Sequence, residues 1–521
     1  MKLQELSTSS ATKKQILVRR AVLAVTLAFY LFVAWTVFYS PIDDWRWSLD
    51  EIGLRWWLEG VYNNRYVGNF FAVVLTRSPV LKTLVMGGVT FAIPFLMALL
   101  AARGEEKRFL PAFLAGNAGI LLMPSVMWRE TYYWVSGFGN FVVPTALFLV
   151  WLLILRRVAD RRDHLRAWSA LLFPMTLAMG LFVENLTLLF LGGSLILAIY
   201  AVWDKELRLP FWLCLAGSGL AAFLMFFNGV YSVLVQAGEA IDGYRQLSFS
   251  LEDGLLSAFA AVLSQYVCQL LPRAFTLGVH MALPMGVITA LGFWRSRYRP
   301  LCALGLFPLA HCLAMMVLQV IDAPWACAGS VFSWGLPILA LAVQQGEKKE
   351  KRRQMLLYLS APLALLPLAA TSSLVLRHHF FPMVMVILTA VDMAGPLLTR
   401  RWGWTAPAAL MAGLMLCWGV PCAHIAACTQ LREELIQQAA ATGQDTLVLP
   451  TDRYQYTVWA GRNAYDPDLA NCFREMNQLD RDVTLIFLPP GSYEIWPETT
   501  REQWDARAEY GPSDAPLQLI P

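Results

Sequence analysis

The chain has 521 residues, of which 57% are hydrophobic and only 15% are charged, whereas a soluble globular protein carries about 25% charged residues. Its mean hydropathy is +0.50 and its apolar residues gather in blocks, so the composition excludes a soluble enzyme, a disordered chain and a secreted disulfide-rich scaffold. The net charge of +4 is small and gives no argument for binding nucleic acid.

The first apolar run, residues 21–39, reads AVLAVTLAFYLFVAWTVFY and holds no charged residue. Its length matches the ~20 residues that a helix needs to cross a bilayer. The run is too long for the core of a signal peptide, and no small-residue cleavage site follows it. We therefore expect an uncleaved membrane anchor.

Further apolar blocks follow along the chain and predict an all-α polytopic membrane protein with about 13 transmembrane helices. The expected membrane domain covers residues 1–428. The predicted spans lie near residues 20–40, 80–102, 109–126, 141–155, 167–183, 186–203, 209–228, 274–293, 301–321, 331–343, 355–376, 380–398 and 405–428.

The loops between these spans differ in charge. One alternate set, which begins with the N-terminal tail, holds 25 of the 41 Lys and Arg residues. The opposite membrane-proximal loops hold 9, and residues 429–521 hold 7. Because Lys and Arg concentrate in cytoplasmic loops, we expect a cytoplasmic N-terminus. An odd number of spans then places residues 429–521 outside the cytoplasm.

Residues 429–521 change composition abruptly and predict a small extracytoplasmic α/β domain. A helix over 434–442 stops at Gly443, and the runs 445–450 and 483–489 have the character of strands. The domain lacks catalytic signatures, which favours a lid or a docking role. Cys428 and Cys472 are candidates for a disulfide that the sequence leaves open. No CxxC pair or Cys/His cluster indicates a metal site.

Two adjacent carboxylates, Asp43 and Asp44, follow the first span in the segment PIDDWRW. Acidic groups at a membrane boundary are unfavourable unless they are solvated, paired or used. One interpretation is that they only end the helix, with Pro41 supplying turn chemistry. Another is that one of them removes a proton from a nucleophilic hydroxyl. A third is that they hold a divalent cation, Mg²⁺ or Mn²⁺.

The loops on the same side carry arginine almost to the exclusion of lysine. Arg129, Arg273 and Arg377 each lie directly against an apolar span. Arginine recognises phosphate with two parallel hydrogen bonds, so these three are candidates for binding an anionic headgroup. Arg55 and Arg77 are expected only to extend their side chains to the interface.

Four segments together carry a resemblance. Bacterial polytopic membrane proteins of one family share an Asp-Asp-aromatic motif after the first span, a following Gly-Arg, a Trp-x-x-Gly-x-x-Asn-aromatic segment and a Glu-Asn pair. Asn64 stands where that family has Gly, and Phe141 where it has Tyr. The family is similar to C-type (GT-C) glycosyltransferases, which use polyprenyl-phosphate sugars. In this chain the segments are PIDDW (41–45), NNRYVGN (63–69), YYWVSGFGNFVVP (132–144) and FVENL (182–186).

The resemblance implies an inverting transferase in the bacterial inner membrane. It would move a sugar from a polyprenyl-phosphate donor to a cell-envelope glycan or lipid acceptor at the outer face, in contact with membrane lipid. Asp44 would act as the base, supported by Asp43. The residues implied to bind substrate are Arg65, Arg129, Glu130, Trp134, Asn140, Glu184, Asn185, Arg273, Arg377 and His378.

Two other functions remain open at this point. A polysaccharide polymerase or ligase shares the outer arginines and a lipid-linked donor. A lipid or glycan transporter (flippase) typically shows internal repeats and charged residues near the bilayer midplane. We find no repeat, and the acidic residues of the apolar region gather at one interface, which favours the transferase.

Overall fold

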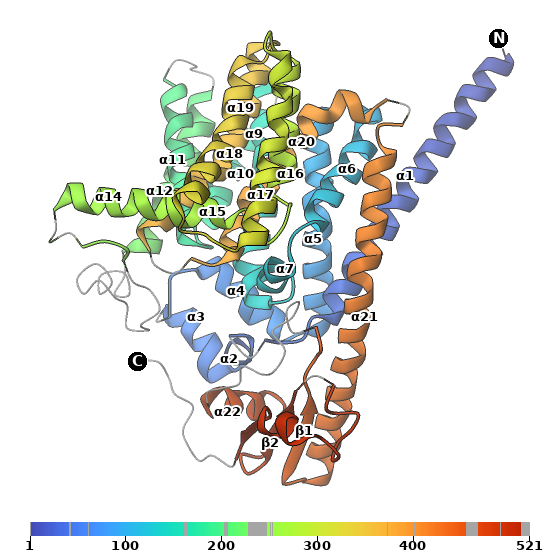
Figure 1. The fold of residues 1–521 in the computed structure, drawn as a ribbon, viewed down its shortest axis with the longest axis vertical. Coiled ribbons are helices and arrows are strands. Elements are labelled where there is room, and N and C mark those ends of the chain that lie inside the picture. Colours follow the sequence, from blue (N-terminus) through green and yellow to red (C-terminus); the bar gives the residue numbers. More distant parts are fainter. Residues whose placement is uncertain are drawn as a thin grey trace.

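The computed structural model describes residues 2–40, 43–60, 62–160, 165–202, 207–227, 247–250, 252, 254–371, 374–400, 402–454, 467–489 and 491–511. The described chain is a bundle of apolar helices that carries a small sheet at one end, while the N-terminus lies at the opposite end (Figure 1). We call these the sheet end and the far end. Much of the third predicted outer loop, residues 228–246, lies outside the described residues.

The N-terminal half of the bundle alternates long helices with short ones. The elements are α1 (Lys2–Thr36), α2 (Asp44–Ser48), η1 (Asp50–Leu54), α3 (Arg55–Glu59), α4 (Tyr66–Thr76), α5 (Pro79–Ala102), α6 (Glu106–Leu121), α7 (Ser125–Thr131), α8 (Val135–Gly137), η2 (Phe138–Val142), α9 (Val143–Asp160), α10 (Leu165–Met179), α11 (Glu184–Tyr200) and α12 (Arg208–Phe226).

The C-terminal half completes the bundle and adds the sheet. The elements are α14 (Leu255–Gln265), η5 (Tyr266–Leu270), α15 (Leu271–Arg273), α16 (Ala282–Trp294), η6 (Arg299–Leu306), α17 (Phe307–Leu318), α18 (Pro324–Val343), α19 (Lys348–Leu365), η7 (Leu366–Ala370), η8 (Leu376–His379), α20 (Phe380–Leu398), α21 (Thr405–Thr442), β1 (Thr446–Pro450), α22 (Pro467–Met476), β2 (Thr484–Leu488), α23 (Arg501–Asp505) and β3 (Ala508–Tyr510).

Ten described helical segments are long and apolar enough to cross a membrane, and α6 with α7, bent by 98°, makes an eleventh. The chain is therefore a multi-pass membrane protein, but the thirteen expected spans are not confirmed. Helices α10, α11 and α16 are shorter than a full crossing. The chain between α10 and α11 leaves the helical conformation, because Leu181 accepts a hydrogen bond from the backbone of Val67 (3.1 Å) and Val183 is extended.

Helix α14 differs in direction from the other long helices. It lies across the direction of α16 to α20 (Figure 1), although the continuous segment Leu255–Arg273 passes the length and hydropathy test for a span. Leu255, Leu256 and Phe259 on α14 are all more than half exposed. The sequence predicts an apolar piece at 255–271 that lies in or dips into the membrane.

The last long helix, α21, runs through the predicted domain boundary at residue 428 and ends at Thr442. Gly443 follows with φ of +60°, as its predicted role as a helix stop requires. Strands β1 and β2 are the two predicted from the sequence, and they pair in parallel. The third strand, β3, pairs antiparallel with β2.

The sheet and the first loop share one hydrophobic core. Trp45 of α2 packs on Phe473 of α22 with ring centroids 4.8 Å apart, and Trp47 and Trp56 join the same cluster as Leu447 of β1. The C-terminal domain therefore rests directly on the segment that follows the first span. This contact fixes the backbone around Asp43 and Asp44.

A buried arginine ties the C-terminal domain together. Arg474 of α22 donates from Nε to the carbonyl of Val483 (2.9 Å), from Nη1 to Asn471 Oδ1 (2.7 Å) and from Nη2 to the carbonyls of Tyr510 and Gly511 (2.8 Å each). One side chain thus connects α22 with β2 and the end of β3. Burial lowers the pKa of this guanidinium, and carbonyl oxygens take up its N–H groups.

Candidate site at the sheet end

Asp44 is fully buried, and each of its two carboxylate oxygens accepts two hydrogen bonds. Oδ2 accepts from the backbone N–H of Ser40 (2.9 Å) and of Val135 (3.2 Å). Oδ1 accepts from the N–H (3.0 Å) and from Oγ (2.6 Å) of Ser136. The carboxylate therefore joins the end of the first span to α8, which begins 91 residues later in the chain.

The environment of Asp44 acts on its pKa in two directions. Burial is the larger cause and raises the pKa to about 6, while the bonds from Ser136 and Ser40 lower it. The carboxyl group is consequently ionised at neutral pH and becomes protonated in mildly acidic solution. A base whose oxygens already accept four hydrogen bonds has no acceptor site left for a substrate proton.

Asp43 is placed differently. Its side chain is half-buried rather than buried, and the residue precedes α2, where its carbonyl accepts a hydrogen bond from the N–H of Trp47 (2.9 Å). Among the described residues no group of three or more His, Cys, Asp or Glu side chains is arranged to hold a metal ion. The four donors around Asp44 also do not fit a cation, because each points a hydrogen at the carboxylate.

Trp134 connects Asp44 to the predicted arginine cluster. Its chain neighbours Val135 and Ser136 bind Asp44, while its ring lies 5.0 Å from the guanidinium carbon of Arg377. Phe141 lies 5.7 Å from the same guanidinium. Arg377 is therefore held against two aromatic rings, a geometry that favours a cation. Its Nε is buried and donates to no acceptor among the described residues.

Glu130 lies at the centre of the three arginines that the sequence singled out. It accepts from the backbone N–H of Arg377 (3.0 Å), and its Oε2 is 4.0 Å from Nη1 of that residue. It also interacts electrostatically with Arg129 of α7 and Arg273 of α15. Nη1 of Arg273 donates to the carbonyl of Leu374 (2.5 Å). Arg273 interacts more strongly with Asp322 than with Glu130, so at least two carboxylates face the three guanidinium groups.

Arg65 and Glu184 form a two-pronged ion pair beside this cluster. Nε and Nη2 of Arg65 lie 3.0 Å and 2.8 Å from the two carboxylate oxygens of Glu184. Both side chains are about one-quarter exposed. His378 interacts electrostatically with Arg65, with Glu184 and with Arg377. The predicted residues from four distant segments therefore meet in one region.

The two predicted asparagines have packing roles. Asn140 is buried and donates to the carbonyl of Ser136 (2.9 Å), which steadies the segment that binds Asp44. Asn185 is also buried but donates to the carbonyl of Ala364 (3.1 Å), so it joins α11 to α19. The structure does not bring Asn185 into the arginine cluster.

Two glycines allow this close packing. A Cβ at Gly137 would lie 2.4 Å from the carbonyl oxygen of Glu130 and from the ring of Trp134, and a Cβ at Gly68 would lie 2.1 Å from Oδ1 of Asn140. Any side chain at either position would displace groups of the site.

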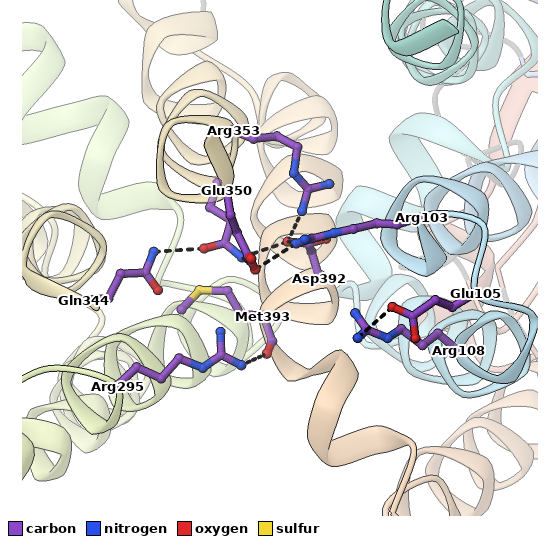
Figure 2. A network of polar contacts seen from close by, with 10 residues as sticks. Arg103, Glu105, Arg108, Arg295, Gln344, Glu350, Arg353, Asp392 and Met393 are labelled. Atoms are coloured by element: carbon purple, nitrogen blue, oxygen red, sulfur yellow. Dashed lines mark hydrogen bonds and ion pairs between the residues drawn. The ribbon is translucent and has the colours of Figure 1, made fainter. Parts of the chain in front are cut away.

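A second charged cluster lies at the far end and was not expected (Figure 2). Asp392 of α20 is buried, and its carboxylate pairs with Arg103 (2.8 Å to Nη2) and with Arg353. Gln354 donates to the same carboxylate (2.9 Å), and Glu350 accepts from Arg103 (3.0 Å). These contacts raise the pKa of Arg103 and join the α5–α6 connection to α19 and α20.

The sequence holds signals for residues that we did not single out. Asp392 is the only ionisable residue in the apolar run of α20, and such residues mark functional or structural pairs in membrane helices. The expectation that acidic residues gather at one interface is therefore wrong. Ser136 has no comparable signal, because a serine among aromatic residues does not reveal that it donates to Asp44.

Comparison with known proteins identifies no relative. No protein-family model, no curated protein and no solved structure matches this chain.

Proposed function

We propose that the protein is a membrane glycosyltransferase that takes a sugar from a polyprenyl-phosphate donor and passes it to a glycan or lipid hydroxyl at the sheet end. The observation that carries the proposal is Arg377, which lies against the rings of Trp134 and Phe141 and whose buried Nε donates to no acceptor among the described residues. A phosphate oxygen would accept a hydrogen bond from this Nε. The apolar helices around the cluster suit a polyprenyl chain.

The cluster is suited to a leaving group whose charge grows. When the bond between the anomeric carbon and the phosphate oxygen breaks, the oxygen keeps the electron pair and the lipid phosphate gains negative charge. Preformed cationic groups stabilise such a charge more than they stabilise the bound donor. Arg377, fixed by Trp134 and by Glu130, needs little rearrangement to do this.

We assign the base to Asp43 rather than Asp44. The acceptor hydroxyl attacks the anomeric carbon from the face opposite the phosphate and transfers its proton to a carboxylate, so the configuration inverts. Asp43 is half-buried, whereas Asp44 is buried and its oxygens are taken by four donors. Asp44 instead holds α8 in place, and with it Trp134.

The orientation follows from the charge of the loops. With the N-terminus in the cytoplasm of a bacterium, the sheet end faces the extracytoplasmic side of the inner membrane. The C-terminal domain would then cover the site at its aqueous edge, since α22 packs on α2 through Phe473 and Trp45.

The test is turnover of a radiolabelled polyprenyl-phosphate sugar by the full chain in proteoliposomes. We expect Arg377→Ala to lower turnover by about 10²-fold, since loss of one preorganised group that stabilises the transition state has an effect of ~10²–10³. Arg55→Ala is the matched control, because Arg55 is half-exposed and its ion pair among the described residues is with Glu59 one helical turn away. Equal turnover in both variants would remove the phosphate role.

One observation favours a transporter as the second candidate. The cluster of Asp392, Arg103 and Arg353 lies within the helices at the far end, and ionisable groups inside membrane segments occur along transport pathways. If Asp392→Asn abolishes movement of a labelled lipid across the bilayer while Asp43→Asn does not alter it, the transporter is the better account.

A further inference from the structure

Two neighbouring connections at the far end are strongly basic. Residues 294–299 run from the end of α16 to the start of η6, and residues 344–354 run from the end of α18 into the first turns of α19. Together they hold eight Lys and Arg residues and two Glu residues. The backbone N–H of Gln345 donates to the carbonyl of Arg295 (2.8 Å), so the connections lie side by side, next to the Asp392 cluster (Figure 2). We call the two connections together the basic rim.

The first turns of α19 divide the charges of the basic rim between two faces. On the inner face, Glu350 and Arg353 belong to the Asp392 cluster. On the outer face, Lys348 and Arg352 are exposed. Within the described ranges, neither of these two side chains makes a hydrogen bond or an ion pair. Their charges are therefore available to a partner outside the chain.

The outer face of α19 continues as an apolar surface. Leu356 follows Arg352 by four residues and Leu363 follows it by eleven, spacings that return to the same face of a helix. The two leucines are 62% and 47% exposed. The segment Lys348–Ala370 passes the length and hydropathy test for a membrane span. Since exposed leucines of a span contact acyl chains, Lys348 and Arg352 lie at the depth where lipid headgroups begin.

The connection between α16 and η6 has the same character. Trp294 and Tyr298 are exposed, as are Arg297 and Arg299. The guanidinium of Arg297 lies 4.8 Å from the ring of Tyr298, and Arg299 is the first residue of the next segment that passes the test for a span. Trp and Tyr collect at the boundary between membrane and water. This half of the basic rim therefore lies at headgroup depth as well.

We propose that the basic rim binds the headgroups of anionic phospholipids, with their acyl chains along the exposed leucines of α19. Four to eight Lys and Arg residues directly beside a membrane helix attract anionic lipid, and each raises binding by about fivefold. A nucleic acid would meet the same charges, but the exposed tryptophan and leucines next to them favour a lipid. The surface is independent of the proposed transferase site, which lies at the sheet end.

The first experiment locates the lipid on the full chain. The protein is placed in phosphatidylcholine nanodiscs that contain a photoactivatable phosphatidylglycerol, and mass spectrometry identifies the labelled peptides. Residues 294–299 and 344–354 should be labelled about 10-fold more than by photoactivatable phosphatidylcholine at the same mole fraction. Equal labelling by the two lipids, or labelling by phosphatidylglycerol only at other segments, would overturn the proposal.

Two competitors distinguish a lipid from other sources of phosphate. At constant ionic strength, neither excess inorganic phosphate nor a single-stranded oligonucleotide should reduce labelling by phosphatidylglycerol. Displacement by inorganic phosphate would show a site for the free anion. Displacement by the oligonucleotide would show a surface for nucleic acid. Either result would contradict the proposed partner.

The second experiment measures affinity by native mass spectrometry of the delipidated protein titrated with phosphatidylglycerol. The rim variant combines Arg299→Gln, Lys348→Gln and Arg352→Gln, which replace exposed side chains without ion pairs among the described residues. Because three charges are lost at about fivefold each, the dissociation constant should rise by about 10²-fold. The midpoint of thermal unfolding should stay that of the wild type, which excludes a general loss of structure.

A control variant removes the same charge from the sheet end. It combines Arg55→Gln, Arg481→Gln and Arg501→Gln, which replace exposed arginines. This variant should keep the wild-type affinity for phosphatidylglycerol. An equal loss of affinity in both triple variants would assign binding to the net charge of the protein, and no loss in the rim variant would remove the basic rim as the site. Each of these results would overturn the proposal.

Discussion

Replacement of Asp44 by asparagine separates a structural role from a catalytic one. An asparagine side chain keeps one acceptor oxygen but turns an NH₂ group toward two of the four donors around Asp44. Two buried N–H or O–H groups then lack an acceptor, at about 1–3 kcal/mol each. The folded state therefore loses roughly 2–6 kcal/mol of stability from these contacts.

A second effect opposes this loss and depends on pH. Because burial raises the pKa of Asp44 to about 6 from its ordinary value of 3.8, the ionised folded state at pH 8 carries a penalty of about 3 kcal/mol. Asparagine is free of that penalty. The folded wild type binds more protons than the unfolded chain between pH 4 and pH 6, so its stability rises as pH falls through 6. No such gain occurs in the variant.

The two effects leave Asp44→Asn less stable than the wild type by on the order of 1 kcal/mol at pH 8. At pH 5 this difference in stability is larger by about 1.4 kcal/mol, because the wild type gains stability as Asp44 becomes protonated. Guanidinium unfolding of the full chain in micelles at both pH values measures it. At pH 8 the variant should keep sugar transfer within a few-fold. A loss of 10²-fold or more in transfer, with unfolding that matches the wild type at both pH values, would show that Asp44 is the base and refute the reasoning.

Other substitutions test the remaining contacts. Glu184→Gln should weaken the two-pronged pair with Arg65 and raise the KM for donor more than it lowers kcat; an unchanged KM would count against a role for this pair in binding. Gly137→Ala should displace the ring of Trp134 from Arg377 and reduce turnover by ~10-fold or more. Gly192→Ala is the control, because a Cβ there has no atom within 4 Å, and it should leave turnover unchanged. Asp392→Asn leaves Arg103 and Arg353 without their buried carboxylate partner. It should destabilise the protein by about 3 kcal/mol, measured by unfolding in micelles. Unchanged stability would mean that both arginines are hydrated and do not depend on Asp392.

The apolar blocks and the turn residues predicted the class of the fold because they act locally. The helix stop at Gly443 and the strands at 446–450 and 484–488 were predictable because each depends on residues that are adjacent in the sequence. The number of spans did not follow, since hydropathy does not register how far each apolar block stays helical, and α10, α11 and α16 are shorter than a full crossing. The continuation of α21 past residue 428 was also not predicted, because a polar sequence with high helix propensity can extend an apolar helix without a break in the sequence pattern.

The structure brings several of the expected site residues into one region, but it leaves Asn185 outside it and gives Asp44 a role in holding α8. Charge and residue type were enough to select Arg65, Glu184 and Arg377 as polar groups on one side of the membrane. Which aspartate is buried depends on where α8 lies, because Ser136 of α8 donates to Asp44 across 92 residues of sequence. The Asp392 cluster was missed although Asp392 stands alone as an ionisable residue in an apolar run, because its partners Arg103 and Arg353 lie far away in the sequence.

The most direct test of the account is single-turnover sugar transfer from a labelled polyprenyl-phosphate sugar by Asp43→Asn in proteoliposomes, with donor binding measured on the same sample. A general base contributes roughly 10²–10⁴-fold. The account predicts a loss of that size in the rate of transfer with donor binding unchanged. Transfer at the wild-type rate by Asp43→Asn would contradict the assignment of the base and, if Arg377→Ala also retains full transfer, the glycosyltransferase itself.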